Sequence, residues 1–397
     1  MRDALDLAKL IVVDRPLDPV LEVTRYIGEW NRRFGHDPIF RFDAVRGSAG
    51  IPLVMNLLTR ETLLRSLGVG DLPSPLRALG ERLEAPGVVV ERGSDATRDI
   101  AGLGELPLLH HQPRDAGKYL TSFIGSLTDP DGGRHNLGFY RAQVAGEREL
   151  ILFADARTDA HRIITAGLAR RDSVPITLFN GGPLSLYLAA AAKIPPGLDS
   201  FEAAARLQGS PIHIDCGDYP PAPADAEIVL HGQITREIRD EGPFGEFKGY
   251  YSGTTRSPVV RIDAIRSRDD PYCLGLFCGK ESGLTLMALQ NEMLLFAHLR
   301  ALGFAVRSVR YPLAAFGEYA AVIEADAPTP DMLEAAMAFD GRAKLVVVAH
   351  DATHIAKELA IFPTDSRHRP YIRHGRAEGQ QIGLISARTL GYHWTEY

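Results

Sequence analysis

Two glutamates stand five residues apart in the stretch DEGPFGEFKGYY, residues 240–251. Glycine, proline and aromatic residues surround Glu241 and Glu246, so a loop beside an apolar wall is expected here rather than a helix. Two carboxyl groups held close together on a rigid loop have pKa values that are pushed apart, with one group ionised and one protonated. The pair therefore predicts a proton donor that works near neutral pH. Exposed turn glutamates are the alternative.

A second short stretch, NLGFYR at 136–141, holds an arginine and two further polar residues. On a strand with a period of two, Asn136 and Tyr140 share one face and Arg141 points to the other. An arginine among apolar residues is costly to bury unless it has an anionic partner. The two glutamates could supply that partner, which predicts an acid/base site of one arginine and two carboxyl groups. A purely structural salt bridge is the alternative.

Three other motifs are weaker candidates for a functional site. HDATH (350–354) follows a strand directly and lacks the helix that the HExxH zinc motif requires, so surface or phosphate-side histidines are favoured over a zinc site. FNGGPLS (179–185) is typical of a loop that presents backbone N–H groups to an anion, and equally of a plain turn. His110 and His111 precede a proline turn, where a structural role is favoured over ligand binding.

The elements that must position these residues are mostly strands. Residues 149–156, 173–179, 226–235 and 258–268 read as strands, and DPDGG at 129–133 predicts the turn of a hairpin. Strand-rich segments with few helices indicate an antiparallel sheet or barrel. Helical spacing appears at 21–34 and 285–303, and a strand–helix–strand pattern after the second helix predicts a small α/β domain.

Composition limits the class of protein. The chain has 397 residues, 45% of them hydrophobic, so two or three domains are expected. Its net charge is −6, so neither nucleic acid nor an anionic membrane is an expected partner. Its three cysteines, Cys216, Cys273 and Cys278, form no CxxC pair, which suits a reducing compartment. No stretch predicts a signal peptide or a membrane span, so a cytoplasmic location is predicted.

Several segments together resemble the UbiD family of reversible decarboxylases. PRDAGKYLTSFIGSLTDPDGGRHNLGFYR (113–141) is similar to one family signature. AEIVLHGQI…DEGPFGEFKGYY (226–251) is similar to another, with His231 where glutamate is usual. The segments LVMNLLTRETLLRSLG (53–68) and AKLVVVAHD (343–351) match more weakly.

The resemblance implies an α+β fold of three parts. These are an N-terminal α/β domain (1–112), a central split β-barrel of flavin-reductase type that holds the cofactor (113–305), and a small C-terminal α/β domain with a tail (306–397). The C-terminal region differs from that of the family and is shorter than in many relatives. A homo-oligomer, dimer or hexamer, is expected, although the altered C-terminus leaves the mode of association open.

The resemblance also implies a reaction. Family members decarboxylate aromatic or α,β-unsaturated carboxylic acids without oxidation, often reversibly, through a covalent adduct with prenylated FMN, which a flavin prenyltransferase supplies. By matching motif, Arg141 would pair with Glu241 and hold the substrate carboxylate, and Glu246 would stand free as the proton donor. The alternative is a homologue with an altered or lost cofactor site that acts on another substrate or as a subunit of a carboxylase complex. Retention of all three residues argues against a non-catalytic homologue.

In the family, an asparagine, a histidine and a glutamate bind a divalent metal, usually Mn²⁺, that holds the cofactor phosphate near a K⁺ ion. Asn136 matches the first ligand and lies with Tyr140 in the expected cofactor site. The histidine position falls on Arg157 and the glutamate position on Ser200, so both metal ions are in doubt.

Two interpretations of this departure remain. With a shifted register, His161 and Glu202 would join the asparagine as metal ligands. Without a shift, Arg157, Lys193 and Lys344 would neutralise the phosphate directly, because guanidinium groups pair with phosphate in bidentate fashion. The interpretation without a metal is favoured.

Overall fold

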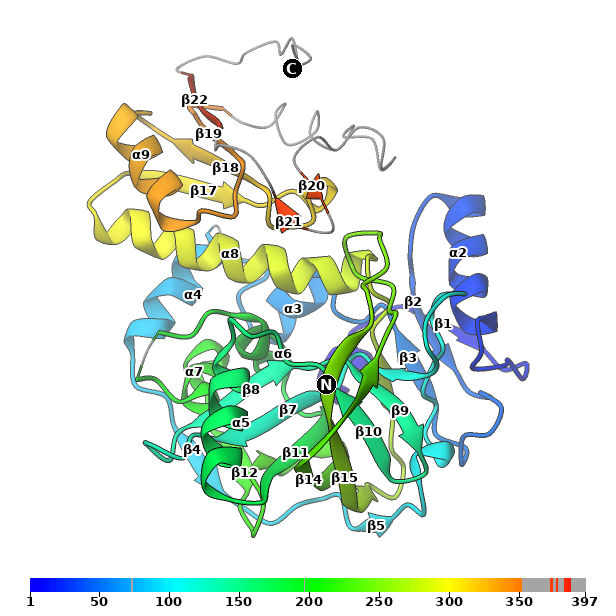
Figure 1. Cartoon of the computed structure of the whole chain (residues 1–397). Helices are drawn as coiled ribbons and strands as arrows, with labels where there is room; N and C mark the ends of the chain where they lie inside the picture. The colour runs from blue at the N-terminus through cyan, green and yellow to red at the C-terminus, as the bar shows by residue number, and fades with distance from the viewer. Residues whose placement is uncertain (73, 196, 352–371, 374–375, 378–381, 387–397) are drawn as a thin grey trace. The chain divides into compact units, whose positions relative to one another are not determined.

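The computed structural model describes residues 1–72, 74–195, 197–351, 372–373, 376–377 and 382–386 (Figure 1). The chain forms two compact units, one of Met1–Gly70 with Ala85–Gly283 and one of Asp71–Glu84 with Leu284–Tyr397. This division falls near the start of helix α8 (Glu281–Ala301), whereas the predicted boundary at 305/306 follows that helix. The three-domain division itself stays a prediction.

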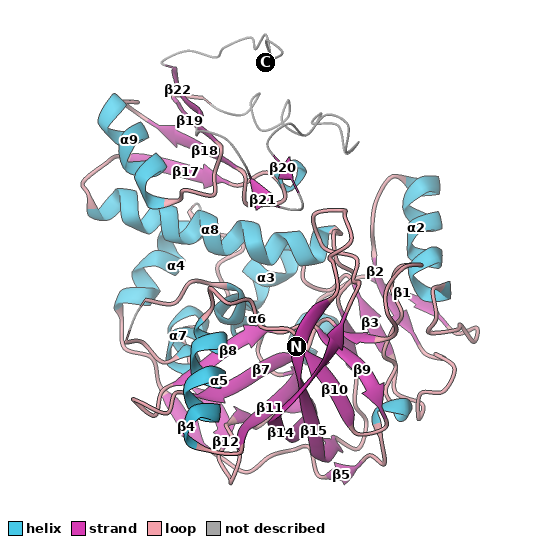
Figure 2. Cartoon of the chain, in the orientation of Figure 1, coloured by secondary structure: helices cyan, strands magenta, loops and turns pink. Residues whose placement is uncertain are grey.

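An antiparallel sheet of nine strands forms the centre of the first unit and curls into a half-barrel (Figure 2). Its order is β6-β9-β10-β15-β14-β11-β7-β8, with β5 beside β15. In β15 buried residues recur among more exposed ones, because one face of the sheet packs on the core, whereas the first five residues of β14 are all buried. The α+β class and the curled antiparallel sheet are confirmed. The strands are β5 (Arg98–Asp99), β6 (Tyr119–Leu120), β7 (Ile124–Thr128), β8 (His135–Phe139), β9 (Ala142–Gly146), β10 (Glu149–Leu152), β11 (Ser173–Gly181), β14 (Ala226–Glu241) and β15 (Thr255–Ser267).

Two smaller sheets and several helices complete this unit. The mixed sheet β1-β2-β3-β16 contains β1 (Leu10–Val13), β2 (Ile39–Phe42), β3 (Leu53–Met55) and β16 (Cys273–Gly275). The sheet β13-β12-β4 contains β4 (Val89–Glu91), β12 (Ile212–Asp215) and β13 (Ala222–Pro223). The helices are α1 (Arg2–Asp6), α2 (Glu22–Phe34), α3 (Arg60–Ser66), α5 (Asp159–Arg170), α6 (Leu184–Ala191), α7 (Ser200–Gln208) and η1 (Leu103–Glu105).

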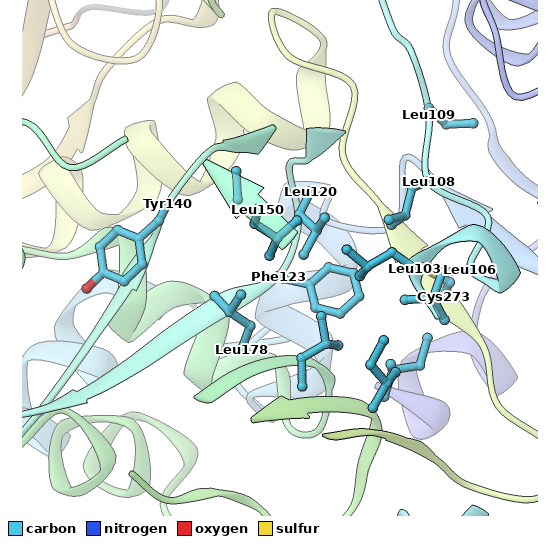
Figure 3. Packing of buried hydrophobic residues seen from close by; sticks show 14 of the residues in the cluster. Leu103, Leu106, Leu108, Leu109, Leu120, Phe123, Tyr140, Leu150, Leu178 and Cys273 are labelled. Carbon is cyan, nitrogen blue, oxygen red and sulfur yellow. The ribbon is translucent and has the colours of Figure 1, made fainter. Parts of the chain in front are cut away.

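An apolar cluster packs against the curled sheet (Figure 3). Leu120 and Phe123 come from β6 and the segment after it, Leu150 from β10 and Leu178 from β11, and each is at most 1% exposed. Full burial of such a side chain stabilises the fold by about 1.5–3 kcal/mol. The cluster therefore fixes the sheet that positions Arg141 and the two glutamates.

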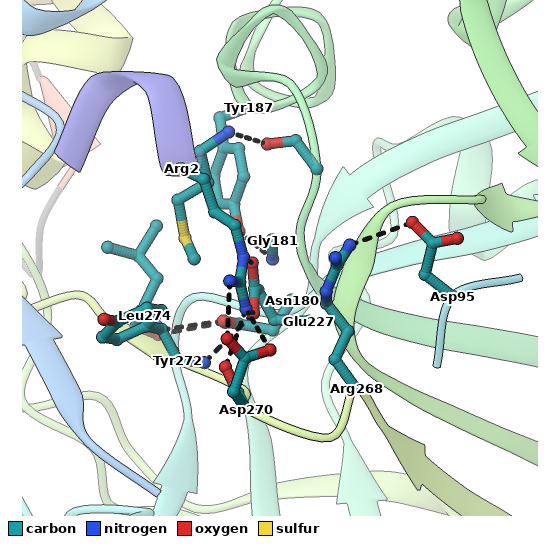
Figure 4. Close-up of polar contacts among 12 residues, drawn as sticks. Arg2, Asp95, Asn180, Gly181, Tyr187, Glu227, Arg268, Asp270, Tyr272 and Leu274 are labelled. Atoms are coloured by element: carbon teal, nitrogen blue, oxygen red, sulfur yellow. Dashed lines mark hydrogen bonds and ion pairs between the residues drawn. The ribbon is translucent and has the colours of Figure 1, made fainter. Parts of the chain in front are cut away.

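An ion-pair cluster joins helix α1 to the sheet (Figure 4). Arg2 donates from Nε and Nη2 to the two carboxylate oxygens of Glu227 on β14, each at 2.8 Å, and also reaches Asp270 at 3.1 Å. Glu227 is 1% exposed and also accepts a hydrogen bond from the Tyr272 backbone N–H. Bidentate geometry suits this buried carboxylate, because both of its oxygens find donors.

The second unit contains the sheet β17-β18-β19-β22. The pair β17–β18 is antiparallel, and β18–β19 and β19–β22 are parallel. The predicted strand–helix–strand pattern is confirmed by β18, α9 and β19. HDATH begins directly after β19, and its last three residues lie outside the described residues. The elements are α4 (Pro75–Glu84), α8, β17 (Val306–Arg310), η2 (Leu313–Ala315), β18 (Ala320–Ala325), α9 (Pro330–Phe339), β19 (Leu345–Ala349), β22 (Ile382–Ser386) and the separate pair β20 (Ile372–Arg373) and β21 (Arg376–Ala377).

Among the helices that the structure describes, none has the length and apolar character needed to cross a membrane.

Candidate active site

The hairpin of β14 and β15 places the two glutamates differently. Glu241 is the last residue of β14 and pairs with Thr255, the first residue of β15. Gly242 follows with a φ of 90°, a conformation that favours glycine, so the chain turns sharply out of the sheet. Glu246 lies in the loop 242–254 that joins the two strands. One carboxyl group is thus fixed by the sheet and the other by a loop.

Arg141 joins β8 to β9 and contacts both carboxyl groups. Its Nε lies 3.0 Å from Oε1 of Glu241 and its Nη2 lies 2.7 Å from Oε2, which is a bidentate pair. Its Nη1 contacts Oε1 of Glu246. Glu241 is fully buried, whereas the side chain of Glu246 is 21% exposed. The structure thus brings together the three residues that the sequence singled out, and their catalytic roles stay predictions.

Two neighbours that the sequence did not indicate support this group. Thr255 donates a hydrogen bond from Oγ1 to Oε2 of Glu241 at 3.0 Å. The guanidinium of Arg141 lies over the ring of Phe153, with its Cζ 4.1 Å from the ring centroid, a favourable cation–π distance. Thr255 could have been found as the cross-strand partner of Glu241, but no motif indicates Phe153.

The contact between Arg141 and Glu246 corrects one expectation. Glu246 was expected to stand free while Arg141 paired with Glu241 alone, whereas a single guanidinium contacts both carboxyl groups. Burial nevertheless raises the pKa of Glu246 above its ordinary value. The cation of Arg141 opposes this shift, the charge of Glu241 adds to it, and Lys248 opposes it weakly. Glu246 therefore holds a proton more readily than an exposed glutamate does.

Asn136 and Tyr140 lie on the same face of the sheet, as the strand period predicts. The hydroxyl of Tyr140 donates to Oδ1 of Asn136 at 2.9 Å and points away from the other labelled core side chains (Figure 3). A Cβ at Gly138 would lie 2.8 Å from the ring of Tyr140, so glycine is needed for the ring to lie against the sheet. Among the described residues, the amide NH₂ of Asn136 donates to no protein group and is available to a ligand.

The three cations assigned to the cofactor phosphate have different surroundings. Arg157 is 75% exposed, and its Nε and Nη2 each lie 2.8 Å from the carboxylate of Asp155. Lys193 is exposed on the segment between α6 and α7. Lys344 belongs to the second unit, where its Nζ donates to the carbonyl of Gly341 at 3.2 Å. Their binding of a phosphate stays a prediction.

The residues near the expected metal site are engaged in other contacts. Ser200, at the glutamate position, is the buried first residue of α7. Asp199 caps this helix and lies 2.9 Å from Nδ1 of His135. Burial opposes ionisation of Asp199, but the hydrogen bonds from His135 outweigh it and lower the pKa of this carboxyl group. Glu202 pairs with Arg206 at 2.6 Å.

The shifted-register ligand set does not form either. His161 is exposed in the first turn of α5, and Oδ1 of Asn136 already accepts the hydroxyl of Tyr140. Across the part of the chain that the structure describes, no three His, Cys, Asp or Glu side chains form a group that could hold a metal ion. The residues present therefore do not fit a divalent metal.

The two remaining motifs have structural roles. The backbone N–H of Gly181 donates to the hydroxyl of Tyr187 at 2.8 Å, and a Cβ at Gly181 would lie 2.5 Å from Cγ of Glu227. The glycines of FNGGPLS thus permit close packing in a plain turn. Burial, and secondarily His110, lowers the pKa of His111 to about 3, so His111 is a neutral interior side chain.

The amino-acid sequence matches a family model over residues 84–281, that of the UbiD 3-octaprenyl-4-hydroxybenzoate carboxy-lyase Rift-related domain. A phenolic acid decarboxylase of Streptomyces sp. (strain D7) is 28% identical over 262 residues, which is 61% of this chain and 55% of that protein. An anhydromevalonate phosphate decarboxylase of Methanosarcina mazei is 27% identical over 290 residues, which is 72% of this chain and 65% of that protein. The chain thus covers less than two thirds of the length of each relative.

The fold gives the broadest match. An evolved dimeric form of the UbiD-class enzyme HmfF from Pelotomaculum thermopropionicum, solved in complex with prFMN, superposes with a TM-score of 0.83 at 25% identity. That match covers 100% of this chain and 96% of the other. The agreement of the family model with the whole-chain fold shows that the chain belongs to the UbiD family, as a divergent member.

Proposed function

We propose that this protein is a carboxy-lyase that reversibly removes CO₂ from an aromatic or α,β-unsaturated carboxylic acid with prenylated FMN as cofactor. The observation that supports this most is the single guanidinium of Arg141 bound to the buried Glu241 and to Glu246, whose pKa is raised by burial. A cation for an anionic substrate and a carboxyl group with a raised pKa are the two groups that such a reaction needs.

We assign the two carboxyl groups separate roles, and their geometry supports this assignment. Glu241 occupies Nε and Nη2 of Arg141 and fixes the plane of the guanidinium. Nη1, which contacts Glu246, is the position that a substrate carboxylate would take. Displacement of Glu246 from Nη1 would remove the interaction that lowers its pKa. Substrate binding would therefore favour the protonated form of Glu246, which is the form that donates a proton.

The bound prenylated flavin would supply the electron sink for loss of CO₂. The amide NH₂ of Asn136 is the available donor for the cofactor in the described part of the site, and Tyr140 orients it through its hydroxyl. Because the residues do not fit Mn²⁺, we propose that the cofactor phosphate is bound without this metal, with Arg157 and Lys193 as exposed cations that could approach it. Arg157 would have to exchange Asp155 for the phosphate.

The proposed reaction also implies a substrate and a supplier of the cofactor. The substrate would be a small carboxylic acid, and a flavin prenyltransferase would supply the cofactor. Association into a dimer or hexamer stays a proposal, supported by the dimeric form of the HmfF structure.

The test is expression together with a flavin prenyltransferase, followed by the absorbance spectrum, the mass of the released cofactor and elemental analysis. We expect bound prenylated FMN and no stoichiometric manganese. Purified protein that contains no flavin under these conditions would refute the proposed function. Flavin accompanied by one manganese per chain would refute only the metal-free phosphate site.

A further inference from the structure

A buried aspartate outside the Arg141 group connects two segments of the first unit. Asp115 is 6% exposed and lies in the segment between η1 and β6. Its Oδ2 accepts the backbone N–H of Gln112 at 2.9 Å, and its Oδ1 accepts the backbone N–H of Gly245 at 2.7 Å. In the described residues no lysine or arginine forms an ion pair with it, so its buried oxygens depend on these N–H donors.

The same two segments meet at further points. The backbone N–H of Ala116 donates to the carbonyl of Pro243 at 2.8 Å. A Cβ at Gly245 would lie 2.7 Å from Cγ of Gln112 and 3.3 Å from Oδ1 of Asp115. The loop 242–254 therefore lies directly against residues 112–116, with no space for one additional carbon atom.

Gly245 is the residue before Glu246, so its hydrogen bond to Asp115 affects where Glu246 lies. The N–H of Glu246 donates to the carbonyl of Tyr250 at 2.9 Å, and the N–H of Gly249 donates back to the carbonyl of Glu246 at 2.9 Å. These hydrogen bonds fix the shape of the turn but not its place against the sheet. Among the external hydrogen bonds of the loop, the one from Gly245 to Asp115 is made by the residue next to Glu246.

We propose that Asp115 is a positioning residue for Glu246: its buried carboxyl group holds the Gly245 N–H. This contact keeps the loop that carries the proton-donating side chain beside Arg141. The proposal rests on the function proposed above for its catalytic consequence. The anchoring of the loop is independent of that function.

Two substitutions disturb the same contact in different ways. Asp115→Asn keeps the shape but presents an NH₂ group to one of two N–H donors, so one hydrogen bond is lost. Gly245→Ala leaves every charge unchanged and forces the loop away from Gln112, while the backbone of this glycine is not in the positive-φ region. Asp129→Asn is the control, because Asp129 is also 6% exposed and also accepts a backbone N–H, from Asp131 at 3.0 Å, in a different turn. Unlike Asp115, it also pairs with Arg162 at 2.7 Å.

The first readout is tryptic cleavage after Lys248 within the loop, followed by mass spectrometry on the flavin-loaded protein and on protein without flavin. We expect Asp115→Asn and Gly245→Ala to be cut at Lys248 at least tenfold faster than wild type, and Asp129→Asn to be cut at the wild-type rate even if its Tm falls. Wild-type rates in both loop variants would overturn the proposal, as would equal acceleration in the control.

The second readout is steady-state decarboxylation. A misplacement of about 1 Å costs on the order of 10²-fold in rate, so both loop variants should lose roughly 10–100-fold in kcat while KM and flavin content stay near wild type. A rise in KM at unchanged kcat would overturn the positioning role. If wild type releases no CO₂, the proposed function fails, and the cleavage data alone decide whether Asp115 holds the loop.

Discussion

Replacement of Glu246 by glutamine tests whether this carboxyl group donates the proton. Glutamine has the same size, and its Oε1 can still accept from Nη1 of Arg141, so the bidentate pair with Glu241 at 3.0 and 2.7 Å should remain. Only the acidic proton is lost. Removal of a general acid costs about 10²–10⁴-fold in rate, or roughly 3–5 kcal/mol of activation free energy. We expect Glu246→Gln to retain the flavin and to lose kcat by that factor.

The same substitution should not destabilise the fold. The folded-state pKa of Glu246 is raised, so its contribution to stability is present at low pH and is lost as pH rises through that pKa. Glutamine is neutral at every pH, so the variant does not lose stability as pH rises through this pKa. The free energy of unfolding of Glu246→Gln should therefore equal or exceed that of wild type at pH 8.

Glu241→Gln is the matched control on the other side of the same guanidinium. Glu241 is fully buried and holds two guanidinium nitrogens, so its substitution leaves the charge of Arg141 without its main partner. Removal of one partner from a buried ion pair costs about 3–5 kcal/mol. We expect this variant to lose both stability and activity, in contrast to Glu246→Gln.

The assays are CO₂ release, incorporation of solvent deuterium into the product, and unfolding in guanidinium chloride. Glu246→Gln with kcat within threefold of wild type, or with wild-type deuterium incorporation, would refute the acid role. If Glu246→Gln lost as much stability as Glu241→Gln, the assignment of Glu241 as the structural partner of Arg141 and of Glu246 as the proton donor would be refuted.

Three further predictions concern the same site. Thr255→Val removes the hydrogen bond to Oε2 of Glu241, which should lower the free energy of unfolding by about 1.5 kcal/mol as measured with guanidinium chloride, and a change below about 0.3 kcal/mol would contradict the assigned contact. Wild-type kcat should fall as pH rises through the raised pKa of Glu246, because the protonated form is active, and a pH profile without this limb would contradict the assignment. Treatment of loaded protein with EDTA should change neither flavin content nor Tm, whereas flavin loss that Mn²⁺ reverses would show that a metal holds the phosphate.

Much of the candidate site could be predicted because its residues stand in short local patterns. NLGFYR places Asn136 and Tyr140 on one face by strand period alone, and the hydrogen bond between them bears this out. DEGPFGEFKGYY contains a buried strand end followed by a glycine-rich loop, which separates Glu241 from Glu246. The strand runs and the DPDGG turn likewise predicted the antiparallel sheet.

The contacts that could not be predicted depend on tertiary packing. Arg157 forms an ion pair with Asp155 in the same turn. The match of Arg157 to the family's metal-binding histidine position gives no sign of this pair. Asp115 lies within the recognised segment PRDAGKYLT, yet its hydrogen bond to Gly245 joins residues 130 positions apart. The contact of Glu246 with Nη1 depends on where that bond places the loop.

The most direct measurement is CO₂ release by the flavin-loaded protein from a panel of carboxyl-labelled aromatic and α,β-unsaturated acids. Flavin-free protein and Arg141→Leu serve as comparisons. We predict release of labelled CO₂ from at least one acid by loaded wild type, and no release by either comparison protein. Stoichiometric prenylated FMN with neither release nor exchange of label from any acid of the panel would contradict the proposed decarboxylase.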